Sequence, residues 1–208
     1  MKKLITTFVL IVVIQLSVSI NYCVCQWEQC EGPYGGTVNA LAVNENTIFA
    51  GTYNGVYLST NKGTSWTQTA LNQHVLSLAI SENNIFAGTV NYGVYLSTNN
   101  GQSWTQTAAL TNQHIYSLAI SGNNIFAGGS GVYLSTNNGQ NWTQTALINQ
   151  AVLSLAISGD SIFAGTSNGV HLSTNNGQTW TQTALTNNTV YSLALSGNNI
   201  FAGTYNNG

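Results

Sequence analysis

The chain has 208 residues, of which 43% are apolar and only 4% are charged. This apolar share is enough to fill the core of a folded domain, so asparagine, threonine, serine, glutamine and glycine must form a polar but nearly uncharged surface. The only basic residues are Lys2, Lys3 and Lys62. Because nucleic-acid binding requires clustered basic side chains that neutralise phosphates, the composition excludes DNA and RNA as partners.

The N-terminus has the pattern of a secretory signal peptide. Two lysines precede an apolar run over residues 4–14, and small residues follow it. We therefore predict a signal peptide over residues 1–25, cleaved after Ser19 or after Cys25, and a secreted, cell-surface or periplasmic protein without a membrane span in its mature chain. The alternative is an uncleaved anchor, because residues 4–20 reach the minimum length of a span, but polar residues within this stretch disfavour it.

The three cysteines, Cys23, Cys25 and Cys30, all lie near the end of this segment. None lies in the repeats that follow, so disulfides are not what holds the fold together. The spacing of Cys23 and Cys25 is not that of a zinc ribbon. A bridge between Cys25 and Cys30 after export, and removal of one or two cysteines with the signal, both stay open.

The rest of the chain is an internal repeat, marked by tryptophans that follow one another at intervals of 38 residues, at positions 66, 104, 142 and 180. Each unit contains four short β-segments separated by turns rich in glycine and asparagine, in the second copy at residues 75–80, 85–89, 94–98 and 104–108. Four strands in about 38 residues make one blade of a β-propeller. The sequence therefore predicts an all-β fold, a β-propeller of four-stranded blades over residues 26–208, with four full blades and a partial one.

The first segment of each unit alternates between small and large side chains. In residues 152–157, one face is expected to carry Val152, Ser154 and Ala156, and the other Leu153, Leu155 and Ile157. A sheet with two apolar faces must be covered on both sides. A radial stack of blades provides this cover by setting the large face of one blade against the small face of the next.

The third segment runs into a repeated turn, Ser-Thr-Asn-x-Gly-x-x-Trp, at residues 59–66, 97–104, 135–142 and 173–180. The asparagine can accept hydrogen bonds from turn amides, the glycine can take a positive φ, and the tryptophan can bury a large apolar area. We assign all three a structural role. They are Asn61, Gly63, Trp66, Asn99, Gly101, Trp104, Asn137, Gly139, Trp142, Asn175, Gly177 and Trp180.

This turn resembles the Asp-box (BNR) motif, Ser-x-Asp-x-Gly-x-x-Trp, of a family of repeat propellers. The resemblance covers residues 27–208, although every copy has asparagine where the family usually has aspartate. The family includes sialidases, sortilin-type receptors, xyloglucan-degrading hydrolases and photosystem II assembly-factor propellers. The resemblance implies a propeller whose boxes lie away from the ligand-binding face, so it implies little about function.

The two ends of the repeat region leave the number of blades open. Residues 27–30 align with residues 66–69, which predicts a fourth strand at the start, and residues 201–208 align with 86–93 and stop before a third strand. The N-terminal strand could complete the last blade and close a ring of about five blades. Alternatively, the sequence is a fragment of a longer propeller, which we favour because an exposed unpaired strand invites association.

Groups for catalysis are scarce, since the only acids are Glu28, Glu31, Glu45, Glu82 and Asp160. Glycoside hydrolysis usually needs two carboxylates that flank one bond, whereas the last three acids fall in equivalent first hairpins of different blades. Sialidases of the resembled family use three arginines, and this chain has none. Nucleophile and nucleotide motifs are absent, and turns with amide oxygens alone suit calcium poorly. We expect no enzyme, catalytic residue, cofactor or metal.

Candidate ligand-binding residues lie on the face opposite the boxes. Two histidines hold matched positions just before the first segments of adjacent blades, and the loops between second and third segments supply aromatic and amide side chains. They are His74, His114, Tyr53, Asn54, Asn91, Tyr92, Asn168 and Tyr205. Such groups could hold a metal or a sugar; the plainer interpretation is that they face water. His171 replaces a tyrosine of the other copies and is interpreted as a packing variant.

We therefore predict an exported, non-catalytic propeller that binds an unknown protein or glycan through this face. The first alternative is a part of an Asp-box glycoside hydrolase, sialidase-like or xyloglucanase-like, whose catalytic residues lie outside this chain. The second is a propeller similar to the photosystem II assembly factors, which the lack of basic residues disfavours.

Overall fold

The computed structural model describes residues 30–108 and 110–205, and these form four four-stranded sheets and one two-stranded sheet, all antiparallel. The first two sheets contain β1 (Val38–Asn44), β2 (Thr47–Thr52), β3 (Gly55–Ser59) and β4 (Thr67–Gln68), then β5 (Val75–Ser81), β6 (Asn84–Thr89), β7 (Val94–Ser97) and β8 (Thr105–Gln106). The third and fourth contain β9 (Ser117–Ser121), β10 (Asn124–Gly128), β11 (Gly131–Ser135) and β12 (Thr143–Ile148), then β13 (Val152–Ser158), β14 (Ser161–Thr166), β15 (Gly169–Ser173) and β16 (Thr181–Thr186). The last contains β17 (Val190–Ser196) and β18 (Asn199–Thr204).

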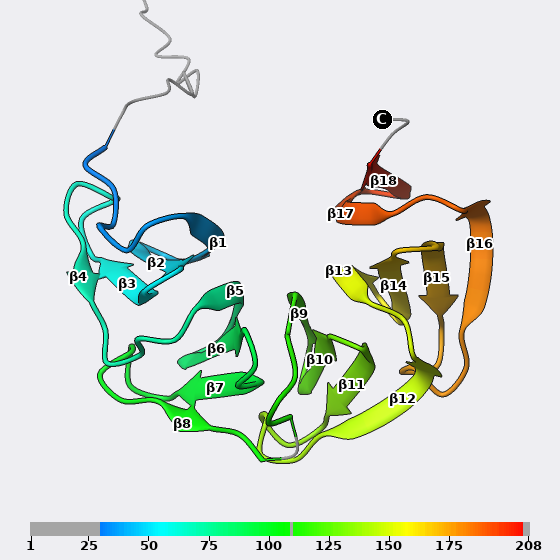
Figure 1. Cartoon of the computed structure of the whole chain (residues 1–208), viewed down its shortest axis with the longest axis horizontal. Coiled ribbons are helices and arrows are strands. Elements are labelled where there is room, and N and C mark those ends of the chain that lie inside the picture. The colour runs from blue at the N-terminus through cyan, green and yellow to red at the C-terminus, as the bar shows by residue number, and fades with distance from the viewer. Residues whose placement is uncertain (1–29, 109, 206–208) are drawn as a thin grey trace, which may run out of the picture.

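The sheets stand side by side around a common axis, which confirms the propeller fold (Figure 1). The first strand of each sheet lies on the inner side of the arc, and the fourth strand lies on the outer side (Figure 1). Neighbouring inner strands contact one another in sequence, from β1 through β5, β9 and β13 to β17. Within the described residues, no helix is present that could cross a membrane.

The arc is open, and its first and last sheets face each other across a gap (Figure 1). Cys30, the last residue of the strand expected at the N-terminus, lies beside the first sheet, because a Cβ atom placed on Gly63 would be 3.9 Å from its Sγ. Residues 27–29 and the predicted signal peptide lie outside the described residues. In the part described, the open arc does not form a closed ring of five blades (Figure 1).

The core lies between successive sheets rather than within one of them. At the junction of the second and third sheets, Phe86 and Val94 of the second pack with Ile115 and Ile125 of the third, and all four are at most 1% exposed. The same arrangement recurs at the junctions before and after this one. Burial of these side chains is the main stabilising contribution available to an all-β chain with so few charges.

One detail of the alternation was wrong. Each inner strand of four sheets contains a β-bulge near its start, for example where the pairing steps from Val75–Thr89 to Ser77–Gly88. A bulge adds one residue and reverses the side on which the earlier residue points. Val152 therefore packs in the same junction as Leu155 and Ile157, not on the small face with Ser154 and Ala156.

The nesting of a large face against a small one is retained despite this correction. Ser77 faces the next sheet, where its Oγ donates a hydrogen bond to the carbonyl oxygen of Ile115 at 3.1 Å. Gly88, opposite Ser77 in the sheet, could not carry a side chain, because an added Cβ would lie 2.8 Å from that same carbonyl oxygen. Small residues are thus needed where neighbouring inner strands approach closely.

The asparagine boxes form the turns that were predicted. In the first, Asn61 Oδ1 accepts hydrogen bonds from the Ser65 amide at 2.9 Å and from the Ser59 hydroxyl at 3.0 Å, and Ser59 Oγ accepts one from the Gly63 amide at 2.9 Å. All four copies repeat these bonds. The box glycines have φ between 74° and 87°, which explains why glycine is required there. An asparagine oxygen therefore fills the acceptor role without a negative charge.

The second, third and fourth boxes also join their sheets to the preceding ones. The indole Nε1 of Trp142 donates to Thr107 Oγ1 at 3.1 Å, and the equivalent bonds run from Trp104 to Thr69 and from Trp180 to Thr145. Trp142 is 8% exposed and also donates to the carbonyl oxygen of Gly139 at 3.0 Å. The turn motif is therefore part of the junction between blades.

His171 lies on β15 at the place of a tyrosine in the other copies, and it is only 7% exposed. Its Nδ1 atom is buried without a hydrogen-bond partner. Burial lowers the pKa of this imidazole below its ordinary value of 6.5, because the charged form loses hydration. The buried position fits the interpretation of His171 as a packing variant.

We expect Trp142→Phe to lower the free energy of unfolding by about 1–3 kcal/mol, because it removes a buried indole hydrogen bond and leaves a small cavity. Trp66→Phe is the matched control. Trp66 is only half-buried and donates to Gly63 alone, so its replacement should cost less. Urea denaturation of both variants measures the difference. Equal losses would show that the bond between sheets does not contribute.

We expect His171→Tyr to flatten the pH dependence of stability. As pH falls below about 6.5, the unfolded chain takes up a proton at this position while the folded chain resists it, so the wild-type protein loses stability. The loss continues until pH reaches the lowered pKa of the folded state. Thermal unfolding midpoints from about pH 7 to about pH 5 should fall further in the wild type than in the variant. Parallel curves would contradict the buried neutral state.

Candidate ligand-binding groove

Aromatic pairs mark the end of the sheets at which the second strands finish and the inner strands begin. Tyr53 follows β2, and its ring lies 4.6 Å from that of His74, which precedes β5. Asn39 Nδ2 lies 3.2 Å from His74 Nε2. The structure therefore brings together Tyr53 and His74, two of the residues predicted from the sequence, at the junction of the first and second sheets.

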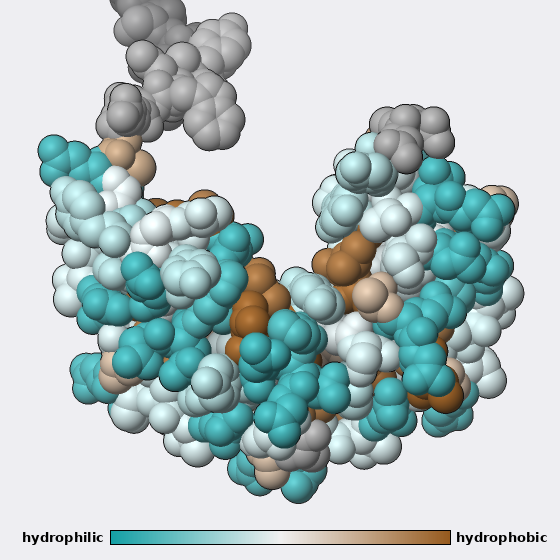
Figure 2. Space-filling view, in the orientation of Figure 1, coloured by the Kyte–Doolittle hydropathy of each residue, from teal (hydrophilic) through white to brown (hydrophobic). Residues whose placement is uncertain are grey.

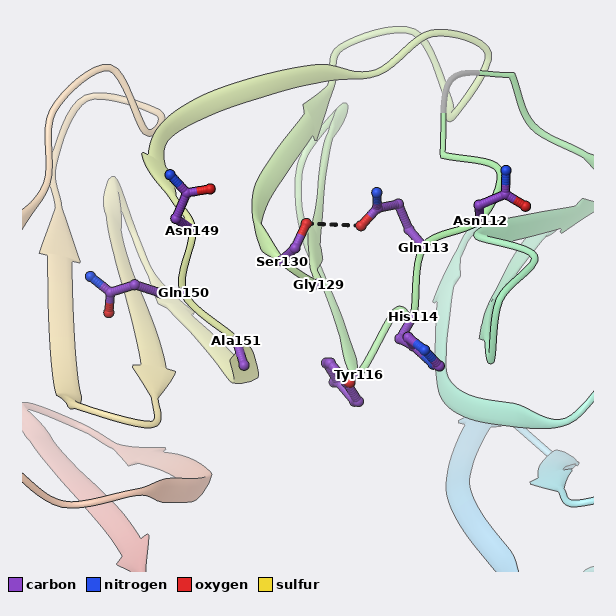
Figure 3. Close-up of a pocket in the computed structure, with 9 residues that line it drawn as sticks. All are labelled: Asn112, Gln113, His114, Tyr116, Gly129, Ser130, Asn149, Gln150 and Ala151. Atoms are coloured by element: carbon purple, nitrogen blue, oxygen red, sulfur yellow. Dashed lines mark hydrogen bonds between the residues drawn. The ribbon is translucent and has the colours of Figure 1, made fainter.

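A second pair lies beside a groove of this face. His114 and Tyr116 stack with ring centroids 5.9 Å apart and planes inclined by 10°. The groove has a volume of about 400 Å³ and lies at the loop end of the third sheet, between the linkers that precede and follow this sheet (Figure 3). Its lining consists of Asn112, Gln113, His114, Tyr116, Gly129, Ser130, Asn149, Gln150 and Ala151.

The groove exists because the loop between β10 and β11 is short. Val132 follows Phe126 by six positions, whereas the corresponding separations in the first, second and fourth sheets are seven, eight and seven. In addition, Gly129 stands in the loop where the other copies begin with a threonine, such as Thr89. A shorter connection with a smaller first side chain leaves this junction open on the loop side.

Hydrogen bonds hold one wall of the groove. Ser130 Oγ donates to Gln113 Oε1 at 2.8 Å, and it lies 3.1 Å from the hydroxyl of Tyr133, which can donate to it (Figure 3). The backbone carbonyl of Gln113 accepts from the amide of Gly93 at 3.1 Å. On the opposite wall, Gln150 Oε1 is buried without a partner. The groove thus contains one fixed amide, that of Gln113, whereas the Gln150 side chain points away from the groove (Figure 3).

The groove lining carries no charged side chain. Glu45 and Glu82 lie in the turns between first and second strands, with φ of 52° and 53°, and Asp160 lies in the equivalent turn of the fourth sheet. Lys62 lies in a box turn after β3. These turns are at the opposite end of the sheets from the groove, so a bound ligand meets only neutral groups.

The remaining predicted residues do not enter the groove. Asn54, Tyr92 and Asn168 lie in hairpin turns, and their backbone carbonyl groups accept bonds of 2.7–2.9 Å from the side chains of the glutamines at positions 68, 106 and 182. Asn91 supports its turn with a φ of 65°. Tyr205 pairs with Tyr191 at the end of the arc, with centroids 6.1 Å apart. The predicted set is therefore spread around the face, and His114 alone of it lines the groove.

Sequence reasoning missed most of the groove, namely Gln113, Tyr116, Ser130, Asn149 and Gln150. The signal was present in the length of the loop around Ser130, which is shortest in the third copy. A related sign is Gln144, whose equivalents bond to the hairpin carbonyl groups. In the described structure Gln144 makes no such bond, and its Nε2 lies 3.1 Å from where a Cβ on Gly131 would be.

Among the described residues, no three His, Cys, Asp or Glu side chains gather in a way that could hold a metal ion. His74 and His114 lie at different junctions, each beside its own aromatic partner. The chemistry that the face offers is therefore aromatic stacking and neutral hydrogen bonding.

No family model matches the chain, and no curated protein matches it. Solved structures do. The extracellular domain of BT4673, a putative one-component system of B. thetaiotaomicron, matches with a TM-score of 0.72 and 22% identity over 85% of this chain and 27% of that one. An ancestral GH74 enzyme matches with a TM-score of 0.65 and 28% identity over 72% of this chain and 24% of that one. YCF48 from Cyanidioschyzon merolae matches with a TM-score of 0.64 and 14% identity over 85% of this chain and 66% of that one.

The chain spans about a quarter of the length of the first two of these proteins. At 22% and 14% identity, the likeness to BT4673 and YCF48 shows the fold alone. These propeller neighbours agree with the four boxes that the structure forms. The chain is a β-propeller, and its four repeated turns resemble the Asp-box (BNR) motif.

Proposed function

We propose that the protein is an exported, non-catalytic binding module that takes a protein or glycan ligand into the groove at the loop end of the third sheet. The observation that carries this proposal is the groove itself, about 400 Å³ in volume, with a stacked aromatic pair and several amides in its lining. Concave sites with aromatic surface and a few polar groups are typical of ligand binding.

Export is supported by the signal-like N-terminal pattern, which lies outside the described residues, and by a neighbour that is an extracellular domain. A surface of neutral polar side chains suits such an environment as well as any other. The scaffold role is supported by the rigid meander of each sheet, which holds the loops at fixed positions.

A non-catalytic role is supported by the placement of the acids. Glu45, Glu82 and Asp160 lie in turns at the far end of three different sheets from the groove. General acid and base chemistry requires a titratable group within hydrogen-bond reach of the reacting atoms. Of the titratable groups, the groove lining offers His114 and Tyr116 and no carboxylate.

The alternative is that the chain forms part of a hydrolase whose catalytic residues lie outside it. The matches to an ancestral GH74 enzyme and to the GH74 enzyme of Niastella koreensis favour this candidate, at 28% and 23% identity. Sequencing the reading frame beyond the codon of Gly208 distinguishes the two. Further blades with paired acids would support the hydrolase.

The binding proposal predicts that the purified protein binds at least one member of a panel of neutral oligosaccharides, acidic oligosaccharides and displayed peptides. Replacing His114 and Tyr116 together, as His114→Ala and Tyr116→Leu, should weaken that binding at least about tenfold, because aromatic anchors dominate binding energy. These are the residues that the fourth sheet carries at the same positions, Ala151 and Leu153, so the fold should be kept. Biolayer interferometry measures the affinities.

Glu82→Gln is the control, because Glu82 lies at the other end of the second sheet. Its affinity should equal that of the wild type. If nothing in the panel binds, or if the double variant binds as well as the wild type, the groove is not the binding site. Release of sugar from any oligosaccharide by the purified chain would contradict the non-catalytic part.

A further inference from the structure

Three aromatic pairs follow one another around the loop face. Tyr53 and His74 lie between the first and second sheets, His114 and Tyr116 lie on the third, and Tyr191 and Tyr205 lie on the last. At least one ring of each pair is well exposed: Tyr53 by 61%, Tyr116 by 36% and Tyr205 by 69%. Exposed aromatic side chains so placed on one end of a propeller form a discontinuous track rather than a single site.

The track continues into the central hollow of the arc. Tyr116 lines both the groove and this hollow, which has a volume of about 270 Å³, and Tyr191 lines the hollow from the last sheet. The hollow is bordered by the inner strands β1, β5, β9, β13 and β17, whose leucines also face it. Figure 2 shows the hydrophobic surface gathered along this inner side of the arc, with hydrophilic surface around it.

The hydrogen-bonding groups along the track are neutral. Beside the rings stand Asn39, Gln113 and Ser130, while the acidic turns of the described residues lie at the opposite end of the sheets.

We propose that this face binds an uncharged, extended oligosaccharide, whose sugar rings stack on the aromatic pairs and whose hydroxyl groups bond to the neighbouring amides. This inference rests on the proposed binding function and names its ligand class. A sugar ring offers apolar C–H faces to an aromatic ring and a rim of hydroxyl groups that both donate and accept, which matches side chains such as Gln113.

The lack of lysine and arginine side chains on the loop face disfavours acidic glycans, and the spacing of its aromatic side chains disfavours a protein ligand. An acidic glycan loses hydration on binding and needs cationic partners, and the only basic residue among those described, Lys62, lies in a box turn at the other end. A protein interface gains most from a continuous buried centre in which tryptophan, tyrosine or arginine anchors cluster. The loop face offers instead separated aromatic pairs with amides between them.

Isothermal titration of the whole protein with linear neutral hexasaccharides of glucose and of mannose, and with a hexamer of galacturonic acid, tests this inference. We expect binding of a neutral hexasaccharide and none of the acidic one. The affinity should be unchanged as NaCl rises from about 0.1 M to about 1 M, because no charge contributes. It should also rise from trisaccharide to hexasaccharide, because a longer chain reaches more than one aromatic pair.

Variants of the exposed tyrosines test whether the oligosaccharide binds to the aromatic pairs. Tyr116→Leu, which copies Leu76 and Leu153 of neighbouring sheets, should weaken binding about threefold to tenfold, as should Tyr53→Ala. Glu82→Gln should leave it unchanged. Equal thermal unfolding midpoints verify that each variant is folded.

The outcomes separate this inference from the function it rests on. Groove-dependent binding of a peptide or of the acidic hexamer, without binding of either neutral hexasaccharide, overturns the ligand class and keeps the binding function. If a neutral hexasaccharide binds equally well to the wild type and to the Tyr116→Leu and Tyr53→Ala variants, the aromatic pairs are not its binding site. The absence of every ligand overturns both.

Discussion

The contact between neighbouring sheets is the constraint on which the rest of the structure depends. Each sheet has two apolar faces, so neither is stable until another sheet covers it. Phe86 and Phe126 show the result, since both are fully buried where a sheet follows theirs, whereas the equivalent Phe201 at the end of the arc is 58% exposed. The bonds from the box tryptophans to the threonines of the preceding sheet add direction to this packing, because they fix how each sheet meets its neighbour.

This constraint separates the end of the sheets that carries the boxes from the end at which we propose that a ligand binds. At one end, the boxes repeat the same hydrogen bonds in every copy, and the acidic hairpin turns lie there too. At the other end, the linkers and the hairpins between second and third strands differ in length and composition. A change there does not disturb the junctions beneath, so ligand contacts can vary without loss of the fold.

The fold was predictable because its signals are local and repeated. The 38-residue spacing, the four short segments and the turn chemistry of Asn61 and Gly63 each required only neighbouring residues, and all three are confirmed. The bulge at Val75 was not predictable. The alternation of small and large side chains in the sequence is the same with or without a bulge, and only the pairing with β6 sets the register. The groove was missed for a similar reason: Gln113 and Gln150 come from different linkers and approach one site only after the sheets have packed.

The groove shows how a repeat gains a site by losing residues. The copies of the 38-residue repeat are nearly identical. A loop face built from identical copies would present the same surface at every junction between sheets, and a ligand would have no preferred position on it. The short loop at Gly129 and Ser130 breaks that equivalence at one junction, and it frees the Gln144 side chain from the carbonyl bond that its counterparts make. Under the proposed binding function, specificity therefore depends on the differences between copies, and the third copy differs from the fourth at His114, at Tyr116 and in this loop.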